Sequence, residues 1–186
     1  MRTLLHVAVL SLVSAIATPA AAQQPATAPA AQQPASLGAT INAFVAIRPG
    51  MTVDDVVRVI GRPGRETSRV ESAGMSAVSY QWTNDDMSAI IVTFQNNAVI
   101  SATQMALKPT YQVKPVTLAM HGQLRQGMTV DEVMAALGGG GVPVSFTSMM
   151  GTVSLSISWP GEALGSTLLA TFTNGRLTTS MQAGLR

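Results

Sequence analysis

The chain has 186 residues, of which 47% are hydrophobic and 11% charged, and its formal net charge is +2. It contains no cysteine, and His121 is the only histidine after His6. This composition excludes disulfide bonds and thiol chemistry and argues against a His-based catalytic triad or a His-rich metal site. It also lacks the large basic surface that nucleic-acid binding requires.

The first residues predict export. Arg2 precedes an apolar run that is too short to cross a membrane, and Ala20-Ala21-Ala22 has the A-x-A pattern of a cleavage site. We therefore expect residues 1–22 to be a signal peptide and the mature protein to be periplasmic or secreted. No lipid anchor and no integral membrane segment are expected. Residues 23–36 are built mainly from Gln, Pro and Ala, which predicts a disordered linker.

A repeated motif organises the remaining chain. The segment that begins at Ile47 returns at Leu124, a shift of 77 residues, and Trp82 returns as Trp159 at the same shift. Such a repeat predicts two copies of one supersecondary unit. The expected parts are unit 1 at 37–107, a linker at 108–116 and unit 2 at 117–186.

Each copy of the motif places Gly-Met-Thr before a predicted helix. The hydroxyl of Thr52 or Thr129 can cap the first turn. The carboxylate three positions later, Asp55 or Glu132, can in turn accept the backbone N–H of that threonine. Glycine then ends each helix. We interpret the motif residues as structural; they are Gly50, Met51, Thr52, Gly127, Met128 and Thr129.

After each helix the hydrophobic period changes to two, which predicts four antiparallel strands in each unit. The predicted fold class is therefore α+β, with two tandem units that each combine a helix-loop-helix with a four-stranded antiparallel sheet. Trp82 and Trp159 stand in register with apolar neighbours and are expected in the core. The opposite face is expected to carry hydroxyls, which in unit 2 are Ser154, Ser156, Ser158, Thr171, Thr173, Thr178 and Ser180.

The Gly-Met-Thr motif, the helix-ending glycine and the Trp-bearing strands together resemble the SmpA/OmlA and β-lactamase-inhibitory-protein-like (BLIP-like) superfamily in its tandem form. The resemblance implies two units side by side with a concave eight-stranded surface. It also implies that the turn between the second and third strands of each unit contacts a partner. The implied contact residues are Asp85 and Asp86 in unit 1, and Leu164 in unit 2, where the family presents an aromatic ring.

The first functional hypothesis is an exported, non-catalytic protein-binding module of the bacterial envelope, accessory to outer-membrane protein assembly or envelope integrity. The alternative is an inhibitor of a secreted enzyme such as a class A β-lactamase. An enzyme of unknown type is disfavoured by the dispersed carboxylates, and glycan binding by the small number of aromatic residues. We expect a monomer with a protein partner in the envelope, and no catalytic residues, cofactor, metal or nucleic acid.

Overall fold

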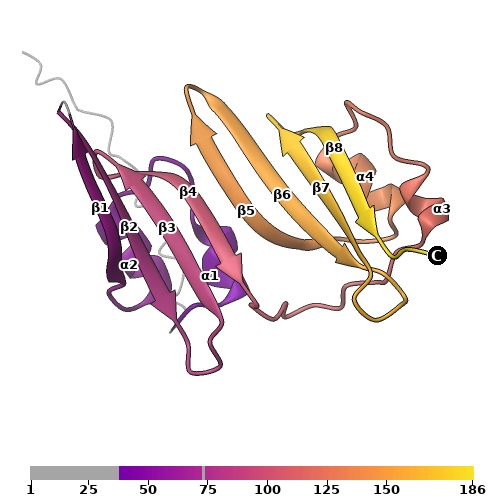
Figure 1. Ribbon diagram of the computed structural model, residues 1–186, viewed down its shortest axis with the longest axis horizontal. Coiled ribbons are helices and arrows are strands. Elements are labelled where there is room, and N and C mark those ends of the chain that lie inside the picture. The colour runs from indigo at the N-terminus through magenta and orange to yellow at the C-terminus, as the bar shows by residue number, and fades with distance from the viewer. Residues whose placement is uncertain (1–37, 73) are drawn as a thin grey trace, which may run out of the picture. The chain divides into compact units, whose positions relative to one another are not determined.

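Eight strands form one antiparallel sheet in chain order, from β1 to β8 (Figure 1). The strands are β1 (Arg65–Ser72), β2 (Met75–Thr83), β3 (Ala89–Gln95), β4 (Ala98–Met105), β5 (Val142–Met149), β6 (Thr152–Pro160), β7 (Thr167–Thr173) and β8 (Arg176–Ala183). Short helices precede each set of four strands. They are α1 (Ile41–Ala46), α2 (Val53–Ile60), α3 (Leu118–His121) and α4 (Val130–Ala136).

The computed structural model describes residues 38–72 and 74–186. The predicted signal peptide at 1–22 and the predicted linker at 23–36 lie outside this range. None of the helices within it has the length and hydrophobicity that a membrane-spanning helix needs.

The predicted fold class is wrong, because the strands do not form two separate four-stranded sheets. β4 pairs with β5 through Ser101↔Thr147, Ala102↔Phe146 and Thr103↔Ser145, which joins the two sets into one sheet. Helices are also a smaller part of the fold than two helix-loop-helix units imply, since the described helices have 6, 8, 4 and 7 residues. The physical reason for the single sheet is that Phe146 of β5 packs into the core of the first half, so that pairing β4 with β5 buries apolar surface.

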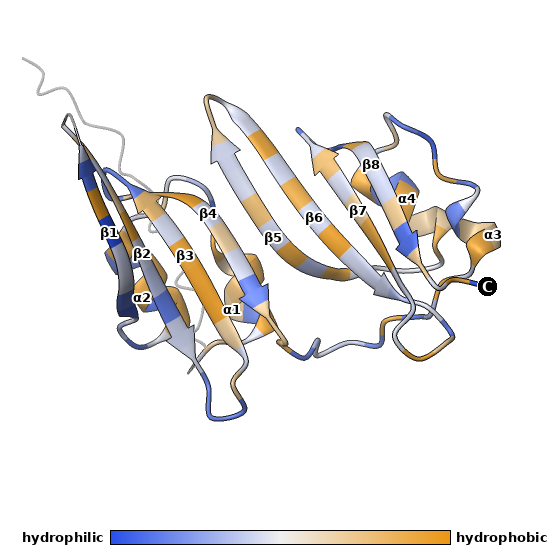
Figure 2. Ribbon diagram, in the orientation of Figure 1, coloured by the Kyte–Doolittle hydropathy of each residue, from blue (hydrophilic) through white to orange (hydrophobic). Residues whose placement is uncertain are grey.

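The register of the strands aligns apolar residues in one row across the sheet and hydroxyl-bearing residues in the next row. One row faces the helices and crosses seven strands as Tyr80, Val92, Ala102, Phe146, Leu155, Phe172 and Leu177. The neighbouring row on the other face is Ser79, Thr93, Ser101, Thr147, Ser154 and Thr173. Figure 2 shows the result as hydrophobic bands that alternate with pale ones along β5, β6 and β7. Side chains alternate between the two faces of a strand, so one face forms the core and the other is polar.

One residue of the predicted hydroxyl face lies on the opposite side. Ser180 pairs with the buried Ala170, and its hydroxyl is 3.1 Å from Nε2 of His121 in α3. The register of β7 and β8 shifts between Thr171 and Phe172, so one extra residue of β8 lies in a bulge and the alternation changes phase.

The two predicted capping boxes are confirmed. The Thr52 hydroxyl accepts the Asp55 N–H at 3.2 Å, and the Thr52 N–H donates to the Asp55 carboxylate at 3.0 Å. In α4 the Thr129 hydroxyl accepts the Glu132 N–H at 3.2 Å, and the Thr129 N–H donates to Glu132 at 2.7 Å. The backbone donors lower the pKa of both carboxyl groups.

The glycines of the motif bring the chain onto the sheet before each helix. Gly50 has a φ of 84° and its N–H donates to the Val99 carbonyl at 2.9 Å. Gly127 has a φ of 86° and donates to the Leu177 carbonyl at 2.8 Å. A side chain is disfavoured at such positive φ values, so these glycines have a structural role.

We predict that Thr129→Ala lowers the free energy of unfolding by about 1 kcal/mol, because the helix loses its N-cap. Urea denaturation monitored by circular dichroism measures this change. Thr129→Ser is the matched control, since it keeps the hydroxyl and should retain most of the stability. Equal denaturation midpoints for wild type and Thr129→Ala would show that the cap contributes nothing.

The same cap has an acid dependence with a defined sign. The folded state lowers the pKa of Glu132 below its usual value of 4.5, chiefly through the Thr129 N–H. The carboxylate's contribution is therefore complete above pH 4.5 and is lost as the pH falls through the lower folded pKa. The difference in free energy of unfolding between wild type and Glu132→Gln, measured by denaturation at each pH, should therefore narrow as the pH falls from 4.5 through the folded pKa.

Candidate functional site

The two loops implied as contacts lie at the same end of the sheet. In a sheet whose neighbouring strands are all antiparallel and consecutive, connections alternate between its two ends. The β2–β3 loop at 84–88 and the β6–β7 loop at 161–166 are therefore on one end, as Figure 1 shows. The hairpin turns between β1 and β2, β3 and β4, β5 and β6, and β7 and β8 occupy the other end.

Asn84 holds the root of the β2–β3 loop against the start of α1. Its Nδ2 donates to the Ala39 carbonyl at 2.7 Å and to Ser88 Oγ at 2.9 Å. Its Oδ1 accepts the Ala39 N–H at 3.2 Å. The Asn84 N–H also donates to the Ser88 carbonyl at 2.8 Å. The loop is thus closed across its base and attached to another element, which restricts its conformations.

Asp86 has a local structural role in this loop. Its Oδ1 accepts hydrogen bonds from both the N–H and the hydroxyl of the buried Ser88, at 3.1 and 2.5 Å. Lys108 lies 3.9 Å away on the link that follows β4. These contacts, with the Ser88 hydroxyl first, lower the pKa of Asp86. One carboxylate oxygen is therefore committed to the turn.

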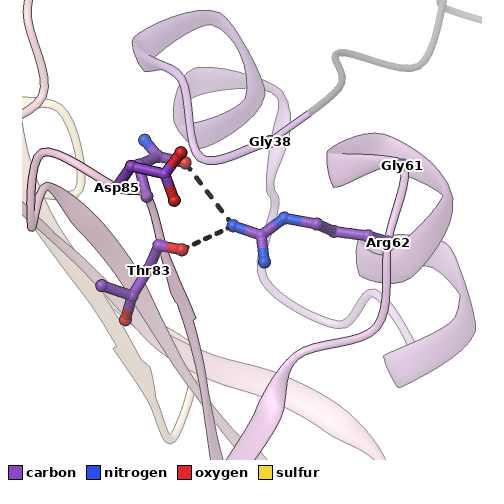
Figure 3. Close-up of a pocket in the computed structure, with 6 residues that line it drawn as sticks. Gly38, Gly61, Arg62, Thr83 and Asp85 are labelled. Atoms are coloured by element: carbon purple, nitrogen blue, oxygen red, sulfur yellow. Dashed lines mark hydrogen bonds between the residues drawn. The ribbon is translucent and has the colours of Figure 1, made fainter.

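Asp85 is exposed and borders a pocket of about 400 Å³ at the base of the loop. The pocket is lined by Gly38, Gly61, Arg62, Thr83, Asn84 and Asp85. Figure 3 shows the Arg62 guanidinium extending toward the loop, where Nη2 donates to the Thr83 carbonyl at 2.7 Å and meets Asn84 Oδ1 at 3.5 Å. These residues offer one cation, one carboxylate and the Thr83 hydroxyl, but no His or Lys to act as a base, which suits polar recognition better than nucleophilic catalysis.

The β6–β7 loop forms a tight turn with Leu164 at its tip. Leu164 has a relative exposure of 107%. The Gly161 N–H donates to the Ser166 carbonyl at 2.9 Å, and the buried Ser166 donates from its N–H and hydroxyl to the Ala163 carbonyl. A Cβ at Gly161 would lie 2.2 Å from Ser166 Oγ, so only glycine fits there.

The two loops share a pattern that the sequence analysis missed. Met87 and Leu164 lie 77 residues apart, the shift that relates Trp82 to Trp159, and Met87 is 82% exposed with a φ of 64°. Asp85 and Glu162 are equivalent at the same shift, and both are exposed. Each loop therefore presents an acidic residue and, two positions later, an exposed apolar side chain. Aligning the two loops at the repeat shift would have revealed this signal.

Trp82 and Trp159 are fully buried, which confirms their assignment to the core. Trp82 Nε1 donates to the Arg62 carbonyl at 2.8 Å, and Trp159 Nε1 donates to the Gly139 carbonyl at 3.0 Å. The indoles support the ends of β2 and β6, from which the two loops emerge. They contribute packing below the loops and no surface for a partner.

The family model of the β-lactamase inhibitor (BLIP) matches residues 40–159, well over half of the chain. The chain belongs to this family. Among solved structures, a Streptococcus mutans protein provisionally assigned as a β-lactamase inhibitor has a similar fold, with a TM-score of 0.61 and 16% identity. That match covers 82% of this chain and 92% of the other, and at this identity it shows the fold alone. No curated protein sequence matched the chain.

The BLIP assignment confirms the coarser part of the resemblance and leaves the SmpA/OmlA relationship as a prediction. The structure gathers the three implied contact residues, Asp85, Asp86 and Leu164, in two loops at one end of the sheet. It separates their roles, because Asp86 closes its own turn whereas Leu164 is fully exposed. Within the described ranges, no cluster of three or more His, Cys, Asp or Glu residues could hold a metal ion.

We predict that Asn84→Ala lowers the free energy of unfolding by about 1–3 kcal/mol, because it leaves the partly buried Ala39 backbone groups without their partner. The exposed Asp85→Ala is the matched control and should change stability by less than about 0.5 kcal/mol. Both are measured by chemical denaturation. Equal stability of the two variants would show that Asn84 does not brace the loop.

Proposed function

We propose that this chain is a non-catalytic protein-binding protein of the inhibitor type, which contacts its partner through the β2–β3 and β6–β7 loops. Membership of the BLIP family supports a protein partner and a role without catalysis. The observation that carries the assignment of the site is the pair of exposed apolar side chains, Met87 and Leu164, in two braced loops at the same end of the sheet.

Both loops are preorganised for binding. A loop that is already held in one conformation loses little entropy when it binds, so more of its contact energy contributes to affinity. Ser88 and Ser166 are both buried and hold their loops from within. An apolar tip that enters a pocket of the partner contributes about 1.5–3 kcal/mol for a side chain of the size of Leu or Met.

The acidic residues supply a second kind of contact. Asp85 and Glu162 stand two positions before the apolar tips, where a carboxylate can meet a basic or hydroxyl-bearing group of the partner. Asp86 contributes less directly, since it holds the turn that presents Met87.

The partner that the family supports best is a secreted enzyme, and a class A β-lactamase is the specific candidate. The similarity to a protein provisionally assigned as a β-lactamase inhibitor agrees with this choice. Export through the predicted signal peptide at 1–22 would bring the chain into the compartment of such enzymes. The envelope-assembly hypothesis shares the export step and the protein partner, but no observation on the loops favours it.

The experiment is a titration of a class A β-lactamase with the purified protein, followed by nitrocefin hydrolysis. We expect concentration-dependent inhibition. The double variant Met87→Ala/Leu164→Ala should weaken it by at least about a hundredfold, since each truncation removes a buried apolar contact. Met150→Ala is the matched control, because Met150 is equally exposed but lies in the β5–β6 turn at the other end of the sheet.

Two outcomes would count against the proposal. Unchanged nitrocefin hydrolysis at micromolar protein would reject a class A β-lactamase as the partner. Equal inhibition by the wild type and the double variant would reject the loops as the contact. Circular dichroism melts of all variants ensure that a loss of inhibition is not a loss of fold.

A further inference from the structure

The last strands of the two halves are β4 and β8. The edge of each that faces away from its own half starts with the same backbone hydrogen bonds. A Gly-Met pair covers the first part of each edge. The Met51 carbonyl accepts the Val99 N–H at 2.9 Å, and the Met128 carbonyl accepts the Leu177 N–H at 2.7 Å. On β4, the stretch beyond this cover is Ser101–Thr103, and β5 pairs with it.

The corresponding stretch of β8 is Thr179–Met181, at a shift of 78 residues. β8 is the terminal strand of the sheet, and no other described strand pairs with its outer edge. The Gln126 side chain covers the Thr178 carbonyl at 3.1 Å, just before this stretch. Thr179 is exposed, and Met181 is 65% exposed. The fold thus repeats at β8 an edge that it already uses for strand pairing at β4.

The other terminal strand is protected by charge. β1 carries Arg69 at the position equivalent to Phe146, and Arg69 pairs with Glu66 at 2.7 Å and with Glu71 at 3.5 Å. Charged side chains of this kind discourage strand addition at sheet edges. β8, in contrast, has no charged residue from Leu177 to Ala183. An uncharged strand would therefore meet uncharged residues along β8, whereas the charged residues of β1 would oppose its addition there.

We propose that the outer edge of β8 at Thr179–Met181 binds an extended segment of the partner protein by antiparallel strand addition. The segment is uncharged and has an apolar residue between two hydroxyl residues, as Ser145-Phe146-Thr147 presents to β4. Its apolar residue would stand opposite Ser180 on the helix side, as Phe146 stands opposite Ala102. This proposal rests on the proposed protein-binding function and adds a surface separate from the two loops.

The test uses the full chain and a synthetic peptide with the sequence of residues 144–149, Val-Ser-Phe-Thr-Ser-Met, blocked at both ends. We expect saturable binding that shifts the backbone amide resonances of 179–181 and leaves those of β1 unchanged. Two further peptides carry N-methyl groups on alternate amides. Strand addition presents one set of amides to β8 and turns the other set away. One methylated peptide should therefore bind at least about tenfold more weakly, and the other should bind as before.

Matched variants locate the edge. Met181→Lys introduces a charge at β8 and should weaken peptide binding by about tenfold. Val70→Lys makes the same kind of change on β1 and should leave binding unaltered. Absence of peptide binding, equal effects of the two methylation patterns, or equal effects of the two lysine variants would each overturn the proposal. None of these outcomes depends on nitrocefin hydrolysis, so failure at β8 is distinguishable from failure of the loop contact.

Discussion

The pairing of β4 with β5 is the constraint on which the rest of the structure depends. The pairing consists of three residue pairs. Neighbouring residues prevent it from extending in either direction. Met51 covers β4 at Val99 on one side, and Pro143, with the bulge that follows it, ends the pairing on the other. Phe146 from β5 packs into the core of the first half, and Leu155 contacts the cores of both halves. A short ladder thus gains most of its strength from apolar side chains on one face.

The link between β4 and α3 reinforces this junction. Thr110 donates to Asn42 of α1 at 3.4 Å, the Tyr111 hydroxyl donates to the Gly141 carbonyl at 2.8 Å, and Val116 donates to Pro160 at 2.9 Å. Partial burial raises the pKa of Tyr111 above its usual value of 10.0, so the hydroxyl remains protonated well above neutral pH. Because the link is attached at three points, the two loop-bearing halves have less freedom to move against each other than an unattached segment would give them.

Local signals in the sequence predicted local structure well, whereas pairing between distant strands left no signal. The Thr-x-x-acid patterns and the register of the tryptophans depend on neighbouring residues, and both were predicted correctly. The residues alone did not predict the single sheet, because alternation identifies a strand without identifying the strand that pairs with it. Ser180 was assigned to the wrong face because the bulge in β8 changes the phase of the alternation. The sequence also showed no sign of close packing at two glycines, because Gly64 and Gly141 are required only by the fold: a Cβ there would lie 2.6 and 2.5 Å from the indoles of Trp82 and Trp159.

The candidate site was predicted as two loops, but not as two versions of one pattern. Met87 was not predicted as a contact, because a single methionine within a polar turn carries no local signal of exposure. Comparison of the two loops also shows where they differ. Arg62 braces the first loop beside Asp85, whereas Gly139 stands at its equivalent position and leaves Glu162 without a matching cation there. A partner that contacts both apolar tips would therefore meet different electrostatic surroundings at each, and charges on the partner could distinguish the two loops.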